Sequence, residues 1–317
     1  MNFWWRAEPP LWSAALLPLE WAYRAGAVLQ RISARPARAR VPVISIGNLT
    51  VGGAGKTPVT RALAMRLIAR GRKPAVLTRG YGRRSRAPIF GVTSSSLVED
   101  VGDEPMLLAK SMPVFVGAKR ARLADIAVEA SGADVLLLDD GLQHHALARD
   151  LDIVVADASN PFGNGALLPR GPLREPLAAL RRVKRGLIWL TRCDLPRHPR
   201  TAELLEMGFP LVESAYEARA DLRGKRVFLF AAIARPESFE AIVRALGAEI
   251  AGTRWFRDHH FFSAEEIAAL RREGELLVTT EKDFVRLSDT VGIIPVPVEV
   301  RISTGEECLE KALEQVL

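Results

Sequence analysis

The chain has 317 residues, of which 48% are hydrophobic and 26% charged, as is ordinary for a folded protein of one large or two smaller domains. Its 44 basic and 37 acidic side chains give a net charge of +7. A basic protein of this kind can bind nucleic acid, anionic lipid or a phosphorylated substrate, and composition alone does not distinguish these partners. The two cysteines, Cys193 and Cys308, lie far apart, which argues against a disulfide scaffold or a cysteine zinc site and favours a reducing cytoplasm.

The first 40 residues are rich in aromatic and basic side chains. The aromatic ones are Trp4, Trp5, Trp12, Trp21 and Tyr23, and an arginine cluster follows at 31–40. No stretch reaches the roughly 18 consecutive apolar residues of a membrane span, and no signal-peptide pattern is present. Two interpretations stay open. The segment is an interfacial helix on a cytoplasmic leaflet, or it is a helix packed on the core and broken by prolines.

Residues 41–221 alternate between strand and helix patterns. Continuous apolar runs, typical of strands buried on both faces, occur at 41–48, 73–80, 135–141, 152–158 and 186–194. Helical periodicity separates them, for example in Val59, Leu63 and Leu67 and again over 121–130. This alternation predicts a doubly wound α/β fold with a parallel sheet.

A second, smaller α/β unit is predicted over 222–317, with a boundary between 205 and 225. Its strand patterns lie at 223–234, 276–283 and 293–302, and its helix patterns lie at 236–247 and 264–274. The alternating run at 293–302 is expected to end the sheet of this unit.

A glycine-rich loop follows the first strand of the larger unit. It reads TVGGAGKT and departs from the G-x-x-x-x-G-K-[ST] phosphate-loop pattern only at its first position; its residues are Thr50, Val51, Gly52, Gly53, Ala54, Gly55, Lys56 and Thr57. The glycines let backbone N–H groups turn toward a phosphate chain, and the following helix adds its positive end. We expect Lys56 to reach the β- and γ-phosphates and the Thr57 hydroxyl to bind Mg²⁺.

Acidic and polar side chains follow the apolar strand at 135–141. Asp139 and Asp140 are placed to hold Mg²⁺ directly or through water, and the sequence does not decide which does more. Gln143 and His144 come directly after them, at the strand end where ligands bind in such sheets.

Three classes of nucleotide protein compete at this point. The stretch TRCD at 191–194 is similar to a guanine-reading element, but Arg192 replaces its lysine, which argues against a GTPase switch. A partitioning or metal-delivery ATPase would carry an extra lysine at the start of the loop, and neither Thr50 nor Val51 is one. A small-molecule or lipid kinase needs a general base and an acceptor site, and three further segments offer them, VGDEP (101–105), LPRGPLREP (168–176) and FRDHHFF (256–262).

Taken in order, TVGGAGKTP, RGYGR, GDEP, DDGLQHH, GPLREP, DHHFF and TTEKD resemble the tetraacyldisaccharide 4′-kinase family of gram-negative outer-membrane biogenesis, over nearly the whole chain. The resemblance implies a P-loop NTPase-like core at 41–221, an N-terminal interfacial region at 1–40, and a C-terminal unit that closes on the nucleotide. It implies transfer of the ATP γ-phosphoryl group, with Mg²⁺, to the 4′-hydroxyl of a tetraacylated glucosamine disaccharide 1-phosphate, a lipid A precursor. It places the protein at the cytoplasmic face of the inner membrane, peripheral or monotopic, with neither nucleic acid nor an obligate protein partner.

The resemblance also assigns roles to residues. It gives Lys56 and Thr57 to the nucleotide phosphates, and Asp139 and Asp140 to the metal, with Gln143 and His144 beside them. It makes Asp103 the base, paired with His259 rather than His260. The substrate or phosphate contacts that it implies are Arg79, Arg83, Arg174 and Glu175.

Overall fold

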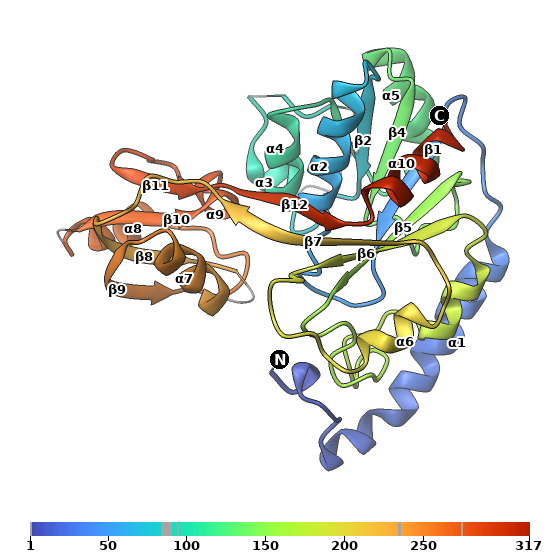
Figure 1. The fold of residues 1–317 in the computed structure, drawn as a ribbon, viewed down its shortest axis with the longest axis horizontal. Helices are drawn as coiled ribbons and strands as arrows, with labels where there is room; N and C mark the ends of the chain where they lie inside the picture. The colour runs from blue at the N-terminus through green and yellow to red at the C-terminus, as the bar shows by residue number, and fades with distance from the viewer. Residues whose placement is uncertain (1, 84–90, 94, 234–235, 274) are drawn as a thin grey trace.

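The computed structural model describes residues 2–83, 91–93, 95–233, 236–273 and 275–317. Figure 1 shows two α/β units side by side, joined by a long antiparallel strand pair, with a helix of the N-terminal region along one flank of the larger unit. The predicted mixed α/β architecture with a large, mainly parallel sheet is confirmed.

The larger unit is built on a sheet of eight strands in the order β12-β7-β6-β5-β1-β4-β2-β3. All neighbouring pairs are parallel except β12 with β7. The strands are β1 (Val43–Gly47), β2 (Pro74–Thr78), β3 (Val114–Val116), β4 (Val135–Asp139), β5 (Leu151–Asp157), β6 (Gly186–Thr191), β7 (Leu211–Ala218) and β12 (Val298–Thr304). The central strands β1, β2, β4 and β5 are buried at every position, which explains their continuous apolar sequences.

Helices cover both faces of this sheet. One face packs against α2 (Lys56–Ala69) and α10 (Glu306–Glu314), and the other against α5 (Arg120–Ser131), α6 (Thr201–Leu205) and the 3-10 helix η3 (Leu177–Arg182). The short helices α3 (Val98–Val101) and α4 (Asp103–Ala109) lie between β2 and β3 in the chain. Val59, Leu63 and Leu67 are fully buried under the sheet, as their helical spacing predicts.

The smaller unit has a parallel sheet of four strands in the order β11-β10-β8-β9. Its elements are β8 (Arg226–Ala231), α7 (Pro236–Ala245), β9 (Glu249–Trp255), α8 (Ala264–Arg271), β10 (Leu276–Thr280), α9 (Glu281–Phe284) and β11 (Ile293–Val296). Ser263 and Glu266 form a capping box at the start of α8. Two apolar clusters, one on each side of the sheet, form its core.

The sheet pairing differs from the sequence-based expectation at the C-terminal end. The run 293–302, predicted as one strand ending the smaller sheet, is two strands that part at Pro297: β11 stays in the smaller sheet, and β12 pairs with β7 in the larger one. Leu309 and Leu313 of α10 are then buried in the core of the larger unit. The smaller sheet therefore spans 226–296, and the last twenty residues return to the larger unit. The strand pattern at 276–283 also ends early, because the Thr280 side chain caps α9.

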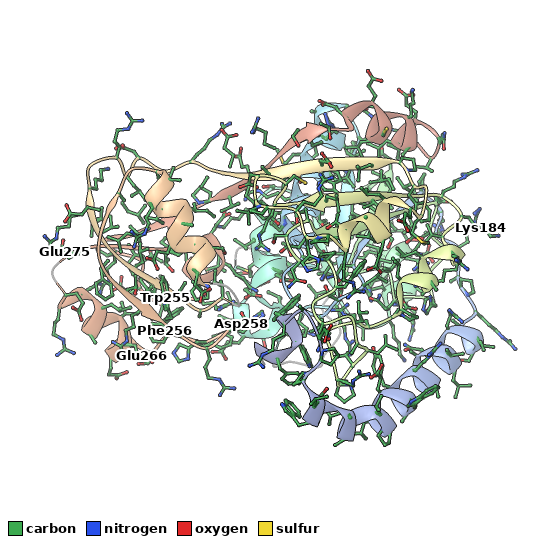
Figure 2. The ribbon with its side chains drawn as sticks, turned by 60° about the horizontal axis from the view of Figure 1, so that its bottom comes forward. Lys184, Trp255, Phe256, Asp258, Glu266 and Glu275 are labelled. Carbon is green, nitrogen blue, oxygen red and sulfur yellow. The ribbon has the colours of Figure 1, made fainter. Side chains whose placement is uncertain are left out.

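The N-terminal region consists of η1 (Asn2–Trp5), η2 (Leu11–Leu16) and α1 (Leu17–Ser33). Helix α1 contains no buried residue, so the alternative of a core-packed helix is wrong. Its apolar side chains, and those just before it, face outward; the most exposed are Leu11, Trp12, Leu19, Trp21, Leu29 and Ile32. Figure 2 shows α1 along the rim of the molecule, with side chains on its outer side. None of the helices in the described ranges is long and apolar enough to span a membrane.

Candidate active site

The glycine-rich loop lies between β1 and α2, as expected. Gly52 and Gly55 have φ of +107° and +86°, in the region that favours glycine. A Cβ added to Gly55 would meet the Tyr216 hydroxyl at 1.8 Å, whereas one added to Gly53 would meet nothing within 4 Å. The loop therefore needs glycine at 55 for both its backbone conformation and the close approach of β7.

Thr50, the one departure from the general loop pattern, has a specific place in the structure. The Asn48 side chain donates a hydrogen bond to the Thr50 hydroxyl (3.1 Å), and Lys56 Nζ donates one to Asn48 Oδ1 (3.0 Å). Thr50 and Asn48 are both buried. This chain of contacts positions the loop lysine. Sequence reasoning missed Asn48, which stands outside the loop motif.

The two carboxylates at the end of β4 have different environments. Asp139 is 2% exposed and accepts hydrogen bonds from Thr60 Oγ1 (3.2 Å) and Thr78 Oγ1 (3.4 Å). Burial, with the nearby negative charges of Glu104 and Asp140, raises the pKa of Asp139 to about 7. The charge of Lys56 and the hydrogen bond from Thr60 act in the opposite direction without outweighing burial.

Asp140 is instead surrounded by cations. Its carboxylate accepts two hydrogen bonds from Arg174 Nη1 (2.7 and 2.8 Å) and lies 3.4 Å from Lys56 Nζ. Burial alone would raise its pKa, but the charges of Lys56 and Arg174 outweigh burial and hold the pKa well below the usual range. Arg120 fixes the backbone of both aspartates, because its Nη1 donates hydrogen bonds to the carbonyl oxygens of Asp139 (2.9 Å) and Asp140 (3.1 Å). Nothing in the sequence around Arg120 marks it for this role.

The predicted neighbours of these carboxylates form one connected group. The Gln143 amide donates to Glu175 Oε2 (3.1 Å) and to the carbonyl oxygen of Asn48 (3.1 Å) and accepts from Arg174 (3.2 Å). The remaining predicted member, His144, has its Nε2 buried without a hydrogen-bond partner among the described residues. Burial, with the charges of Arg120 and Arg149, lowers the pKa of His144 to about 3, so the ring is neutral.

The loop after β2 carries the predicted arginines Arg79 and Arg83. Arg79 is exposed, and the backbone N–H of Arg83 donates to the carbonyl oxygen of Gly80 (3.4 Å). Both residues follow the end of a parallel strand, at the same sheet edge as the aspartates of β4. The positive charge of Arg79 also acts on Arg120, which places it near the carboxylate pair.

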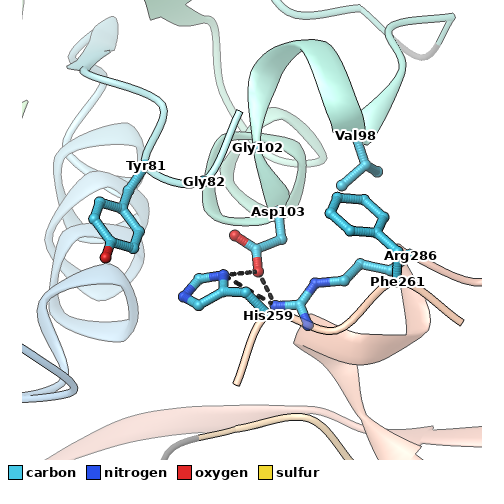
Figure 3. A pocket seen from close by; sticks show the side chains of 8 residues that line it. All are labelled: Tyr81, Gly82, Val98, Gly102, Asp103, His259, Phe261 and Arg286. Carbon is cyan, nitrogen blue, oxygen red and sulfur yellow. Dashed lines mark hydrogen bonds and ion pairs between the residues drawn. The ribbon is translucent and has the colours of Figure 1, made fainter. Parts of the chain in front are cut away.

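The expected pair of Asp103 and His259 is formed across the two units, with His259 Nδ1 3.2 Å from Asp103 Oδ2. His260 points elsewhere, toward the Glu266 carboxylate (2.9 Å). Figure 3 shows Asp103, His259 and Arg286 together in a small pocket that Tyr81 and Phe261 also line. The His259 backbone has φ of +62°, an uncommon value for a residue other than glycine.

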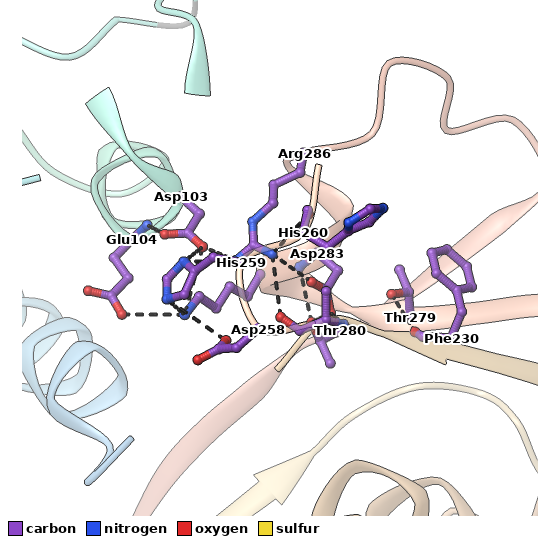
Figure 4. A network of polar contacts seen from close by, with 12 residues as sticks. Asp103, Glu104, Phe230, Asp258, His259, His260, Thr279, Thr280, Asp283 and Arg286 are labelled. Carbon is purple, nitrogen blue, oxygen red and sulfur yellow. Dashed lines mark hydrogen bonds and ion pairs between the residues drawn. The ribbon is translucent and has the colours of Figure 1, made fainter. Parts of the chain in front are cut away.

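Two further cations surround Asp103, and sequence reasoning missed both. Lys282 Nζ lies 3.7 Å from Asp103 Oδ2, and the buried Arg286 guanidinium contacts the same oxygen directly (Figure 4). Burial alone would raise the pKa of Asp103. The hydrogen bond to His259 and the charges of Lys282 and Arg286 outweigh burial and hold the pKa well below its usual range. Asp103 is therefore an ionised carboxylate at neutral pH.

The Asp103 group and the phosphate loop face the same region. Glu104, next to Asp103, acts electrostatically on Asp139. Arg61 of α2, the helix that starts in the loop, pairs with Glu281 of the smaller unit (2.9 Å). The helix that carries the ionised Asp103 therefore lies near the carboxylates of β4, one of which is 3.4 Å from the loop lysine.

Comparisons with known proteins agree over nearly the whole chain. A family model described as tetraacyldisaccharide-1-P 4′-kinase (LpxK) matches residues 12–317. The chain is 46% identical to the tetraacyldisaccharide 4′-kinase of Anaeromyxobacter dehalogenans strain 2CP-1, over 99% of this chain and 94% of that protein. It is 41% identical to the tetraacyldisaccharide 4′-kinase of Methylobacterium sp. strain 4-46, over 98% and 95%.

The chain belongs to the tetraacyldisaccharide 4′-kinase family. A crystal structure of LpxK from Aquifex aeolicus in complex with ATP also aligns with it, at a TM-score of 0.78 and 28% identity, over 96% of this chain and 99% of that one. The family, the P-loop NTPase-like fold and the kinase class predicted from the order of motifs are confirmed. The GTPase and ATPase-switch alternatives are therefore wrong. In this kinase, Arg192 of TRCD pairs with Asp157 and lies over the Tyr216 ring (5.5 Å from its centroid).

The residues of this kinase also fit a magnesium ion. Among the described residues no three His, Cys, Asp or Glu side chains group closely enough to hold a metal ion by themselves. Mg²⁺ commonly takes one or two carboxylates and completes its shell with water and substrate phosphates. Buried Asp139, whose pKa is raised to about 7 by burial and by the charges of Glu104 and Asp140, offers such a carboxylate beside the phosphate loop.

Proposed function

We propose that this chain transfers the γ-phosphoryl group of ATP to the 4′-hydroxyl of a tetraacylated glucosamine disaccharide 1-phosphate, with Asp103 as the general base. One observation carries the proposal. A phosphate loop with its lysine held in place and an ionised carboxylate paired with a histidine occur together in a chain of this family.

The donor half holds the triphosphate. The loop 52–57 and the start of α2 would receive its oxygens, and Lys56, fixed by Asn48, would offset negative charge on the transferred group. Thr57, Asp139 and Asp140 would hold Mg²⁺, which supplies further charge stabilisation when it is bound with the nucleotide. Arg174 completes the cationic surroundings through Asp140.

The acceptor half removes a proton. Asp103 accepts the proton of the 4′-hydroxyl as the oxygen attacks phosphorus, and His259 keeps the carboxylate directed through its Nδ1 contact. A carboxylate of low basicity suffices here, because the transition state of phosphoryl transfer is loose and the base acts mainly by orienting the nucleophile. We place Arg79, Arg83 and Glu175 around the phosphates and the acceptor.

An assay with radiolabelled ATP and a disaccharide 1-phosphate lipid A precursor tests this function. Label in a chloroform-soluble product supports the kinase, whereas release of free phosphate alone would contradict it. Asp103→Ala should lower turnover by about a hundredfold or more, because a positioned base contributes about 10²–10⁴-fold. ATP binding should be retained. Turnover within about threefold of the unchanged protein would remove Asp103 as the base.

We also propose that helix α1 seats the enzyme on the cytoplasmic face of the inner membrane. The outward-facing apolar side chains support this, among them Trp21 at 65% and Ile32 at 72% exposure. An acylated substrate does not leave the bilayer readily, because each exposed CH₂ costs about 0.8 kcal/mol. Membranes carrying the protein should retain it through a mild salt wash. Release by mild salt alone would contradict insertion of α1.

A further inference from the structure

Arg286 of the smaller unit is the most buried of the groups that contact Asp103. Its side chain is 1% exposed, whereas those of His259 and Lys282 are each 24% exposed. A buried guanidinium stays charged and presents its donors in a fixed plane. It is therefore the partner of Asp103 with the least freedom to move.

Only one end of this guanidinium reaches the larger unit. Nη1 stays within the smaller unit, where it lies 3.1 Å from Asp283 Oδ1 and donates weakly to the carbonyl oxygens of Ala232 (3.5 Å) and His260 (3.4 Å). Asp283 is itself held by the Ala232 backbone N–H (3.0 Å). Nη2 lies 3.5 Å from His259 Nδ1 and also crosses to Asp103 of the larger unit, 183 residues away in the chain. The smaller unit thus presents a pre-set donor to the carboxylate.

Each oxygen of the Asp103 carboxylate has its own partners. Oδ1 accepts from the backbone N–H of Glu104 (2.9 Å), within the same helix. The groups that meet Oδ2, namely His259, Lys282 and Arg286, all come from the smaller unit. The orientation of the carboxylate therefore depends on docking of the smaller unit, and Arg286 is the fixed point of that docking.

We propose that Arg286 is a positioning residue for phosphoryl transfer, which holds the base carboxylate in its working orientation when the two units are docked. The inference rests on the proposed role of Asp103 as the base. In this role Arg286 acts through Asp103, which its Nη2 contacts. The enzyme completes its base only by bringing the smaller unit onto the larger one.

Arg286→Met tests this in the full-length enzyme. We expect kcat for the lipid product to fall by about tenfold to a hundredfold, within what a positioned base contributes, and KM for ATP to change less than about twofold. The acid limb of the pH–rate profile should move to higher pH, because loss of the Arg286 charge raises the pKa of the Asp103 carboxylate. The other charged groups around this carboxylate are unchanged in the variant; they are the cationic or titratable Lys282 and His259 and the acidic Glu104, Asp258 and Asp283. Arg271→Gln, which removes an exposed arginine paired with Asp289 on the same unit, is the matched control.

A double-mutant cycle with Asp103→Asn separates positioning from a purely structural role. If Arg286 acts through Asp103, Arg286→Met should cost little further kcat in the Asp103→Asn background. The same fold-loss in both backgrounds, or a kcat equal to that of the Arg271→Gln control, overturns the inference. Should Asp103→Asn alone turn over like the unchanged enzyme, the base assignment itself fails, and that single variant shows it.

Arg286→Lys keeps the test decisive if the methionine variant does not fold. A lysine retains the charge, but a single ammonium group does not span Asp283 and Asp103 as the guanidinium does. We therefore expect a reduced kcat that lies between the methionine variant and the unchanged enzyme, with the acid limb close to its original position. An Arg286→Lys enzyme with unchanged kcat would overturn the positioning role.

Discussion

The two halves of the site are built in different ways. The phosphate half comes from one unit, and its elements lie close in the chain or on neighbouring strands, β1 and β4. The base half joins Asp103 of the larger unit to His259 and Arg286 of the smaller one, more than 150 residues later. A half built within one sheet is complete before any domain docking, whereas a half built across two units exists only in the docked arrangement.

This difference predicts a division of labour. Nucleotide binding should be a property of the larger unit alone, and turnover should depend on both. Variants in the first half should therefore change ATP affinity or the stability of the larger unit. Variants at the contact between the units should change kcat while leaving ATP affinity in place.

The largest effect is expected for Lys56→Ala. Lys56 is fixed by Asn48 and lies 3.4 Å from Asp140, so its loss leaves the transferred group without its preorganised cation. We expect kcat to fall by more than about a hundredfold, measured as radiolabel in the lipid product. The ion pairs between the units should be unaffected, so the thermal unfolding transition should keep its shape. A variant that keeps more than about a tenth of the activity would contradict the assigned role.

Gly55→Ala tests whether the phosphate half is rigid before any nucleotide binds. The substitution forces a side chain into a backbone with φ of +86° and against the Tyr216 hydroxyl. We expect the free energy of unfolding of the nucleotide-free enzyme to fall by about 2 kcal/mol, measured by urea denaturation. Gly53→Ala is the matched control, because its added Cβ meets nothing within 4 Å, and its cost should stay below about 0.5 kcal/mol. Equal costs for the two would show that the loop adapts.

His144 gives the phosphate half a pH dependence. Its pKa is lowered to about 3 by burial and by Arg120 and Arg149, against about 6.5 in the unfolded chain. A group with a depressed folded-state pKa contributes stability that is fully present above pH 6.5 and is lost as the pH falls toward 3. The ring is partly accessible, so the contribution is discounted for solvent screening. His144→Asn should reduce the loss of stability between pH 8 and pH 5 by about 1 kcal/mol. An unchanged difference between the two pH values would contradict this.

Sequence reasoning succeeded where chemistry and structure are local. The loop 50–57, the carboxylates at the end of β4 and the buried strands could be predicted, because each is a short sequence pattern that is compatible with one local structure. The pairing of Asp103 with His259 came only from the resemblance to a family, since spacing along the chain says nothing about two units meeting. Arg286 carries no motif of its own; only its burial between the units reveals it.

The prediction that 293–302 forms one strand of the smaller sheet was wrong for a related reason. The alternating pattern over 293–302 fits a strand in either sheet, and periodicity does not choose a partner. Pro297, between β11 and β12, marks the change of sheet, but a proline at that point equally fits a bulge or an edge. The missed strands give weak apolar signals for different reasons: β3 has only three residues, β9 is largely exposed, and β7 mixes apolar with polar residues and is only partly buried.

Glu281→Gln should have the smallest effect and gives the most selective test of the difference between the phosphate half and the base half. Glu281 joins the smaller unit to the larger one through Arg61 of α2 (2.9 Å) and Lys110, the residue after α4 (3.6 Å). Among the contacts described it touches neither the loop lysine nor Asp103. Partly exposed pairs contribute about 0.2–1 kcal/mol each, so docking should weaken and kcat should fall up to about fivefold. ATP affinity, measured by calorimetry on the same preparation, should stay within twofold, because the phosphate half is complete without the smaller unit. A parallel loss of ATP affinity would mean that both halves are assembled by docking, and the division between them would not hold.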